Sequence, residues 1–468
     1  MKTGNSTQED PAEGSGSRYM DLLEGKMRQT LSCGNVSTKL QRIAQLAKEH
    51  PERSFTAISQ VIDIELLKEA YHRTRKDGAV GVDGQTAKKY AKQLESNLES
   101  LLNRFKDGTY RAPPVKRVYI PKGGGKGLRP IGIPTFEDKI LQRAVAMVLE
   151  AIYEQDFLYC SYGFRAKRSA HQALKAIWDS LMDINGGWVV EVDIKDYFGS
   201  LVHHQLRSFL DRRVKDGVIR RVIDKWLKAG VMEEGLIRHP DTGTPQGGVI
   251  SPVLSNVYLH EVLDVWFERQ VRPMLTGRGT LIRYADDFVM VFEQERDAKR
   301  MMEALPKRCG KYGLTIHPDK TRMLRFERPS HKQDDTKGDG PGSFDFLGLT
   351  HFWGRTRKGR WAVRQQTARS RLTRAVLKIH TWCRSSRHLP VAEQRQTLNR
   401  KLQGHYNYYG IIGNGDALQR FFAEVRKTWR KWLNRRGARR RMSWKRFDSL
   451  LGRHPLLRPR VVHGLGHS

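Results

Sequence analysis

The chain has 468 residues, of which 38% are hydrophobic and 29% are charged. This length exceeds what one small hydrophobic core holds, so about two to four domains are expected. No apolar run approaches the length of a bilayer span, and residues 1–20 lack the apolar core of a signal peptide. The composition therefore favours a cytoplasmic protein and argues against a membrane partner.

The four cysteines lie far apart in the chain, and no two of them form a Cys-x-x-Cys pair. A zinc site or a disulfide framework normally shows closely spaced or regularly paired cysteines. We therefore interpret them as reduced thiols, without a zinc or disulfide role: Cys33, Cys160, Cys309 and Cys383.

Positive charge is the most informative feature of the composition. There are 84 Lys and Arg residues against 50 Asp and Glu, which gives a net charge of +34. Residues 351–468 alone hold 29 of these cations and only 4 acids. A solvated basic tail would explain such a count, but Trp, Tyr and Phe also recur there at helical spacing. A folded basic surface that binds nucleic acid is the favoured interpretation.

The N-terminal quarter of the sequence indicates a tail followed by helices. Residues 1–18 are polar and rich in Gly and Ser, which predicts disorder. Residues 21–105 read as helical, with a glycine-containing loop at 77–86, "DGAVGVDGQT". From 115 to about 350, short β-rich runs alternate with Gly and Pro, which predicts an α+β region.

One long helix is predicted inside this α+β region, over residues 137–153, because its apolar residues recur at helical spacing. Its apolar face consists of Ile140, Ala144, Val148 and Ile152. Residues 328–342 are polar and predict a loop. After about residue 362 the pattern turns helical, with two apolar stripes. These comprise Leu372, Val376 and Ile379, and then Leu418, Phe421, Phe422, Val425, Trp429 and Trp432.

Three acids interrupt strands that are otherwise apolar. Asp193 lies near the end of "VVEVDI", and Asp286 and Asp287 lie in the middle of "LIRYADDFVMVF". A hairpin turn or a capped core acid would explain each of them separately. If the strands are neighbours, however, the three carboxylates meet and repel one another unless cations neutralise them. Mg²⁺ suits such an oxygen ligand set, and two ions can activate an attacking oxygen and stabilise a leaving pyrophosphate.

Two further segments carry groups that phosphoryl transfer requires. "IPKGGGKGLRPIGIP" (120–134) combines a glycine run with Lys122, Lys126 and Arg129, without the Walker A spacing. "TPQGGVISPVLSN" (244–256) places Gln246 in a Pro–Gly turn before a helix. Read singly, the first is equally a plain glycine hairpin and the second a plain turn.

The order of these motifs resembles that of a reverse transcriptase, and specifically of a group II intron-encoded maturase. The resemblance covers about residues 60–435. It rests on "IPKGGGKGLRPIGIPTFEDKILQRA", "SYGFRAKRSAHQAL", "VVEVDIKDYFGSLVH", "GTPQGGVISPVLSNVYLH", "RYADDFVM", "LTIHPDKT" and "FLGL". "SYGFRAKRSAHQAL" has Ala166 and Lys167 where relatives often show Pro-Gly, which changes a turn but not the catalytic residues.

The resemblance implies an α+β right-hand polymerase fold, with fingers and palm built on an antiparallel sheet and followed by an α-helical thumb or maturase domain. The implied divisions follow the chain. They are a disordered tail (1–20), a helical extension with the start of the fingers (21–114), fingers and palm (115–350), the thumb (351–435) and a basic DNA/RNA-binding tail (436–468).

The resemblance also assigns the catalytic and nucleotide-binding residues. Asp193, Asp286 and Asp287 are the implied catalytic acids, and with the Ile194 carbonyl they would bind two Mg²⁺ ions, for which Mn²⁺ could substitute. Phe198 would exclude a ribose 2′-hydroxyl, although core packing is the alternative role for its ring. The implied dNTP-binding residues are Lys122, Arg129, Phe198, Gln246 and Lys320.

Nucleic-acid contacts are implied by the same motifs and by the basic C-terminal third. Gly348 lies in "FLGL", which resembles a primer-grip hairpin, and three tyrosines lie in "LQGHYNYYG" (402–410), one of which is expected in the core. The expected contact residues are Arg165, Tyr284, Gly348, Tyr406, Tyr408, Tyr409, Arg435, Arg436, Arg439, Arg440 and Arg441.

The function that the resemblance implies is RNA-directed DNA synthesis together with binding of a group II intron RNA, which assists splicing and supports mobility by reverse splicing and target-primed reverse transcription. The expected partners are intron RNA, target DNA, an RNA template with a DNA primer, and dNTPs, in a bacterial cytoplasm at the nucleoid. The sequence shows no His-Asn-His site, so no endonuclease domain is expected and the primer would come from elsewhere. Two alternatives stay open: a splicing cofactor without polymerase activity, and a reverse transcriptase used in defence or repair.

Overall fold

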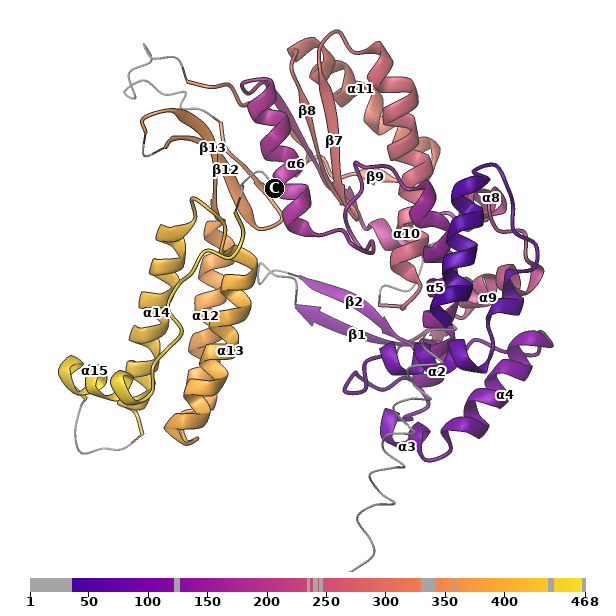
Figure 1. Ribbon diagram of the computed structural model, residues 1–468, viewed down its shortest axis with the longest axis horizontal. Helices are drawn as coiled ribbons and strands as arrows, with labels where there is room; N and C mark the ends of the chain where they lie inside the picture. The colour runs from indigo at the N-terminus through magenta and orange to yellow at the C-terminus, as the bar shows by residue number, and fades with distance from the viewer. Residues whose placement is uncertain are drawn as a thin grey trace, which may run out of the picture. The chain divides into compact units, whose positions relative to one another are not determined.

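The computed structural model describes residues 36–121, 127–233, 236–238, 243, 247–329, 342–356, 358–436 and 442–464. Helices and short strands alternate along this part of the chain (Figure 1), which confirms the predicted α+β class. Several predictions fall wholly or partly outside the described residues: the N-terminal tail, Cys33, most of the 328–342 loop, Lys122, Gln246 and the run from Arg439 to Arg441.

The chain divides into two compact units. The first comprises Met1–Val118, Pro130–Phe157 and Leu201–Val257, and the second comprises Tyr119–Arg129, Leu158–Ser200 and Tyr258–Ser468.

Helices dominate the first unit. After a helix over residues 36–49 come η1 (Ile58–Val61), α2 (Ile64–Arg73), α3 (Ala87–Ala91), α4 (Leu94–Lys106), α5 (Phe136–Asp156), α8 (His203–Asp211) and α9 (Gly217–Lys228). A four-stranded sheet follows the order β2-β1-β5-β6, from β1 (Val115–Pro121), β2 (Leu128–Ile133), β5 (Val231–Glu233) and β6 (Leu236–Arg238). The predicted long helix is therefore present as α5, and its four predicted apolar residues are fully buried.

A buried carboxylate organises the packing of α5 in this unit. Asp138 is 2% exposed and accepts hydrogen bonds from the Tyr110 hydroxyl (2.5 Å), the Trp226 indole (2.6 Å) and the Gln142 amide (3.1 Å). Burial raises the pKa of Asp138 to about 6, and the three hydrogen bonds oppose that shift. The carboxylate joins α5 to α9 and to the chain after α4.

Removal of the tyrosine hydroxyl should destabilise the protein in a pH-dependent way. The folded pKa of Asp138 exceeds its unfolded value of about 4, so stability falls as pH rises from about 4 to 6. Tyr110→Phe removes a hydrogen bond from the ionised carboxylate, which should cost about 1.5–3 kcal/mol near pH 8 and less near pH 5. Urea unfolding at the two pH values measures this difference. Tyr159→Phe, at an exposed site, should show none; an equal loss at both pH values would contradict the prediction.

The second unit contains an antiparallel sheet in the order β10-β3-β8-β7. Its strands are β3 (Trp188–Val192), β7 (Gly279–Tyr284), β8 (Asp287–Phe292) and β10 (Arg322–Arg325), with a short pair β4 (Ile194–Lys195) and β9 (Thr315–Ile316) beside it. Helices α6 (Ala170–Asp183) and α11 (Glu295–Lys311) contact the sheet (Figure 1). Helices α7 (Tyr197–Ser200) and α10 (Ser251–Leu259), the latter spanning both units, complete this part of the chain, and a helical stretch continues α10 to Met274.

A second antiparallel sheet follows, with β11 (Phe344–Phe346), β12 (Leu349–Arg355) and β13 (Trp361–Thr367). Its core residues pack with those of α6 and the first sheet in one cluster. The prediction that the chain turns helical after about residue 362 was wrong by six residues. The alternation of buried Val363, Gln365 and Thr367 marks β13, because every second side chain of a strand faces the same side.

The last part of the second unit is helical, with α12 (Arg369–Ser385), α13 (Val391–Tyr409), α14 (Gly415–Leu433) and α15 (Trp444–Arg453). The predicted apolar stripes are confirmed, since they pack into one cluster around Trp429 and Phe447. Cys160, Cys309 and Cys383 are buried free thiols. Among the described helices, none has the length and apolarity that a bilayer span requires.

Candidate active site

Strand register brings the first predicted aspartate to the other two. In the antiparallel pair of β3 and β8, Val192 lies opposite Phe288. Asp193 directly follows the end of β3, and Asp287 directly precedes Phe288, so the two acids lie next to this last registered pair. Asp286 precedes Asp287 in the β7–β8 turn. The strand that Asp193 follows, β3, is therefore adjacent to β8, the second strand of the acidic hairpin.

The hairpin that carries two of the acids is a tight two-residue turn. Tyr284 pairs with Asp287, which leaves Ala285 and Asp286 at the tip. Ala285 has a φ of +58°, a left-handed conformation that costs energy for a residue with a Cβ. A Cβ on Gly163 would lie only 2.4 Å from the Ala285 nitrogen, so only glycine fits beside the turn. Close packing therefore holds the tip in its strained form.

A buried ion pair anchors the strand that leads into this hairpin. The Arg283 guanidinium and the Asp264 carboxylate are both inaccessible to solvent, and they join through two hydrogen bonds of 2.7 and 2.6 Å. Arg283 also donates to the Ser161 hydroxyl (2.7 Å) and to the Ala285 carbonyl at the tip (3.1 Å). This bidentate pair ties the turn to the helix after α10, and sequence reasoning missed it because nothing in the local pattern distinguishes Asp264 from other acids.

The three acids repel one another. The pKa of Asp286 is raised by desolvation and, to a smaller degree, by the charge of Asp193, while Arg129 opposes the shift. The pKa of Asp287 is raised to about 6, first by desolvation of the carboxylate and then by the negative charges of Asp286 and Asp193. Such a cluster binds a cation more readily than an isolated carboxylate does.

The donor set fits a hard divalent cation such as Mg²⁺. It consists of carboxylate oxygens, and Mg²⁺ normally takes one or two of these together with substrate phosphates. Within the described ranges, no three His, Cys, Asp or Glu side chains already form a closed ligand cluster. Asp193 instead pairs with Lys320, whose Nζ lies 2.8 Å from one carboxylate oxygen. The ammonium group therefore occupies a position beside Asp193 that a cation could take.

The structure describes three of the predicted nucleotide-binding residues. Lys320 contacts Asp193 as stated, Arg129 is exposed and close enough to influence both hairpin acids, and Phe198 is half-buried in α7 with its ring 5.3 Å from that of Tyr197. Ile194, the predicted carbonyl ligand, pairs with Ile316 in β4 and β9.

The "FLGL" motif forms a two-residue hairpin between β11 and β12. Leu347 and Gly348 have φ of +50° and +79°. Positive φ at both central residues is typical of a type I′ turn, whose backbone twist matches the twist of the two strands. The Tyr408 hydroxyl donates to the Leu347 carbonyl (2.8 Å), and a Cβ on Gly348 would meet the Tyr409 hydroxyl at 3.1 Å. Both tyrosines are half-buried and pack against this hairpin.

Two predicted nucleic-acid contacts are corrected by their burial. Tyr406 is fully buried, and its hydroxyl donates to the Leu457 carbonyl at 3.1 Å, so it is the core member of the three tyrosines. Arg165 is 8% exposed and donates to the carbonyls of Leu158 and Ser161 (2.8 Å each), so it supports the loop before α6 instead of facing a ligand. In contrast, Tyr284 is half-buried, and Arg435 and Arg436 are exposed at the end of α14.

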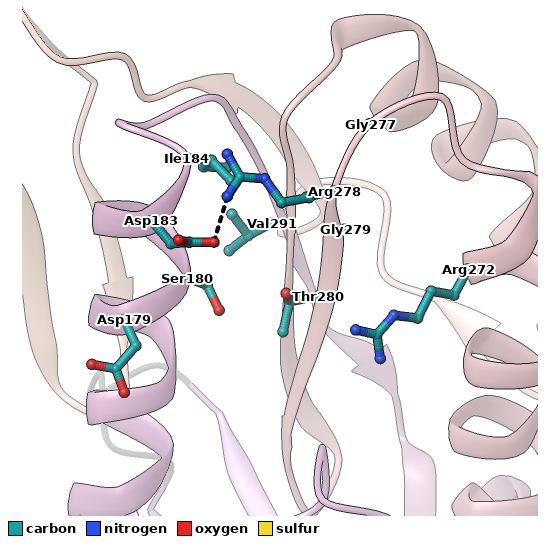
Figure 2. Close-up of a pocket in the computed structure, with 10 residues that line it drawn as sticks. All are labelled: Asp179, Ser180, Asp183, Ile184, Arg272, Gly277, Arg278, Gly279, Thr280 and Val291. Atoms are coloured by element: carbon teal, nitrogen blue, oxygen red, sulfur yellow. Dashed lines mark hydrogen bonds and ion pairs between the residues drawn. The ribbon is translucent and has the colours of Figure 1, made fainter.

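A separate pocket of about 470 Å³ lies between α6 and the start of β7 (Figure 2). Its cations already have partners: Arg278 pairs with Asp183 (2.6 Å) and Arg272 pairs with Glu268 (2.7 Å). None of the predicted site residues lines it. We therefore assign it no role in the chemistry.

Comparison with known proteins agrees with this geometry. The family described as "Reverse transcriptase (RNA-dependent DNA polymerase)" matches residues 120–351, a range that contains all three aspartates. "Protein YkfC" of Escherichia coli is 34% identical over 327 residues, which cover 63% of this chain and 82% of that protein. "Group II intron-encoded protein LtrA" of Lactococcus lactis is 33% identical over 304 residues, or 62% of this chain and 50% of LtrA.

The chain belongs to the group II intron-encoded reverse transcriptase and maturase family. "Nuclear intron maturase 2, mitochondrial" of Arabidopsis thaliana is a further relative, 28% identical over 287 residues. The matched segment covers about half of LtrA's own length.

The buried ion pair predicts a large effect of a single substitution. Asp264→Ala leaves the Arg283 guanidinium buried without its counter-charge, which should cost about 3–5 kcal/mol. Urea unfolding measures the loss. The matched control, Arg283→Met combined with Asp264→Leu, removes both charges and should cost much less. If the double variant loses as much stability as the single one, the loss does not come from the unpaired guanidinium, and the prediction is wrong.

Proposed function

We propose that this protein is an RNA-directed DNA polymerase that also binds a group II intron RNA and assists its splicing. The observation that carries the polymerase activity is the adjacency of Asp193 to the Asp286–Asp287 hairpin in one sheet. The sheet of β10, β3, β8 and β7 would serve as the palm, and the helices α12 to α14 as the thumb of a right-hand fold.

Asp193 and Asp286, with the Ile194 carbonyl, would hold Mg²⁺, and Asp287 would complete the acidic site. Bound Mg²⁺ would supply activation of the primer 3′-oxygen and stabilisation of the pyrophosphate leaving group. Desolvation and, after it, repulsion by Asp286 and Asp193 raise the pKa of Asp287, and the repulsion supports this role. The rigid hairpin keeps its two carboxylates in position against that repulsion.

Substrate binding would use the cations and the ring near these acids. Arg129 is exposed near the hairpin acids, where it can pair with a triphosphate. Lys320 would leave Asp193 when metal arrives and could then contact a phosphate. Phe198, five residues beyond Asp193, would select deoxyribonucleotides by excluding a 2′-hydroxyl. Lys122 and Gln246 complete the proposed set.

The splicing role would depend on charge and shape. Group II intron RNA performs its own chemistry, so a protein assists by stabilising the folded RNA. Residues 351–468 supply 29 cations against 4 acids for that purpose. Intron mobility by reverse splicing and target-primed reverse transcription would combine both activities. Tyr284, Tyr408, Tyr409 and Gly348 would lie near the primer, and the arginines from 435 to 441 near RNA or DNA.

A double substitution should separate the two activities. Asp286→Ala with Asp287→Ala removes two metal-binding carboxylates and should abolish primer extension on an RNA template, while intron binding and splicing stay close to the wild-type level. Primer-extension and splicing assays on the same preparation measure this. Surviving extension would refute the metal-site assignment. Lost splicing in a folded protein would refute the separation of the two activities.

The sugar gate gives a second test. Phe198→Ala should raise the ratio of kcat/KM for an rNTP over its dNTP by about 10-fold or more, since a steric difference of this kind is worth about 1–3 kcal/mol. Single-nucleotide incorporation measures the ratio. Phe422→Ala, which shortens a half-buried ring on α14, should leave the ratio unchanged. An unchanged ratio for Phe198→Ala would assign this ring to core packing.

A further inference from the structure

A pocket of about 540 Å³ lies between α12 and α14, on the helical part of the second unit. One wall comes from α12 and from Arg387 shortly after it, and the other wall comes from the end of α14 and from Arg435 shortly after it. The six residues that line it are His380, Arg384, Arg387, Lys431, Trp432 and Arg435.

The charge of this pocket has one sign. Its lining includes four permanent cations and no acid. Among the described residues, none of these four cations has a carboxylate within salt-bridge distance. The α6–β7 pocket differs, because its arginines are paired with acids. Like charges held close together repel one another, and a bound anion would reduce this repulsion.

The loop that presents Arg387 is held rigidly. The buried Gln394 side chain donates to the carbonyls of Ser386 (3.0 Å), Arg387 (3.2 Å) and Leu389 (2.9 Å). Its own oxygen accepts from the Trp429 indole at 2.9 Å. The Arg436 guanidinium also donates to the Arg387 carbonyl. The backbone under the pocket is therefore positioned before any ligand binds, which lowers the entropy cost of binding.

Trp432 is the aromatic residue of the pocket lining. The residue is 6% exposed, and its indole Nε1 is buried without a hydrogen-bond partner among the described residues. The His380 ring lies 5.2 Å away at an interplanar angle of 71°, and the Arg435 guanidinium lies 5.0 Å from the ring. Because both neighbours cover the indole, little ring face is left for base stacking. The lining therefore suits phosphate groups better than bases.

A simpler explanation for the cations is that they complement the C-terminal ends of α12 and α14. Each helix end carries roughly half a negative charge. Two such ends contribute about one negative charge, against four permanent positive charges in the pocket. The surplus of about three positive charges exceeds what the helix ends need.

We propose that this pocket binds backbone phosphates of structured RNA and fixes the register of that RNA on the helical bundle. The inference rests on the proposed RNA-binding function and adds a defined site to it. A polymer is favoured over a free phosphate because the four cations are exposed and spread over the ends of two helices and the residues that follow them. The volume is also in the range of pockets that hold ligands of drug size, larger than one phosphate group.

The test compares two double variants of the full chain that lose the same charge. Arg384→Gln with Lys431→Gln removes one cation from each wall of the pocket. Lys378→Gln with Arg420→Gln removes two exposed cations from the same helices outside it. Both are exposed substitutions, and thermal melting should confirm that both variants fold. The probe is a fluorescently labelled RNA hairpin with single-stranded ends, titrated at several salt concentrations.

The pocket variant should bind the hairpin about 10-fold more weakly and should reduce the slope of log affinity against log salt by about 1–2, one phosphate contact for each lost cation. The control variant should lose no more than about 2-fold. Equal losses for the two variants would overturn the pocket, because they would mean that charge acts diffusely.

Two further measurements separate the possible failures. Inorganic pyrophosphate that binds the pocket, together with RNA affinity that is the same in the pocket variant and the wild type, would assign the site to a free phosphate and overturn the proposal. Primer extension on a short RNA template should persist in the pocket variant. A wild-type protein that binds no RNA and extends no primer would instead refute the proposed function itself.

Discussion

The position of the acidic hairpin depends on one buried ion pair. Arg283 and Asp264 are both inaccessible to solvent, and the guanidinium also reaches the carbonyl of Ala285 at the tip of the turn. A buried pair contributes little net stability compared with apolar side chains of the same volume. The pair contributes position instead, because its hydrogen bonds hold Arg283, and with it the strand that leads to the acids, in one place. The strained φ of Ala285 is tolerated since the surroundings allow no alternative.

The three acids lower the stability of the fold that holds them. Desolvation and, after it, their mutual repulsion raise the pKa of Asp287 to about 6, so near neutral pH the folded protein carries a carboxylate that its surroundings stabilise less than water does. The Lys320 ammonium beside Asp193 offsets part of this repulsion in the ligand-free chain. A site of this kind is unfavourable when empty and favourable when a cation is present. The fold therefore loses stability at the carboxylates that the proposed chemistry requires.

The sequence predicted the local features well, because they repeat with a period. The apolar face of α5 and the strands around the acids follow directly from spacing. The boundary near residue 362 was wrong because a strand with one polar face was read as the start of a helix. Tyr406 and Arg165 were misassigned for a different reason. Burial of a polar side chain is decided by distant partners, such as the Leu457 carbonyl for Tyr406, and no local pattern contains them.

The same limit applies to charge, and it explains why net charge alone does not locate a binding surface. Arg283 and Arg213 are buried and are consumed by internal partners, Asp264 for the first and Asp156 with several carbonyls for the second. Arg384 and Arg387 contribute the same formal charge, yet in the described structure no acid pairs with them. A count of +34 treats these arginines as equal. What distinguishes them is the fold, which places acids beside the first kind and collects the second kind between two helices, where an external anion is the remaining counter-charge.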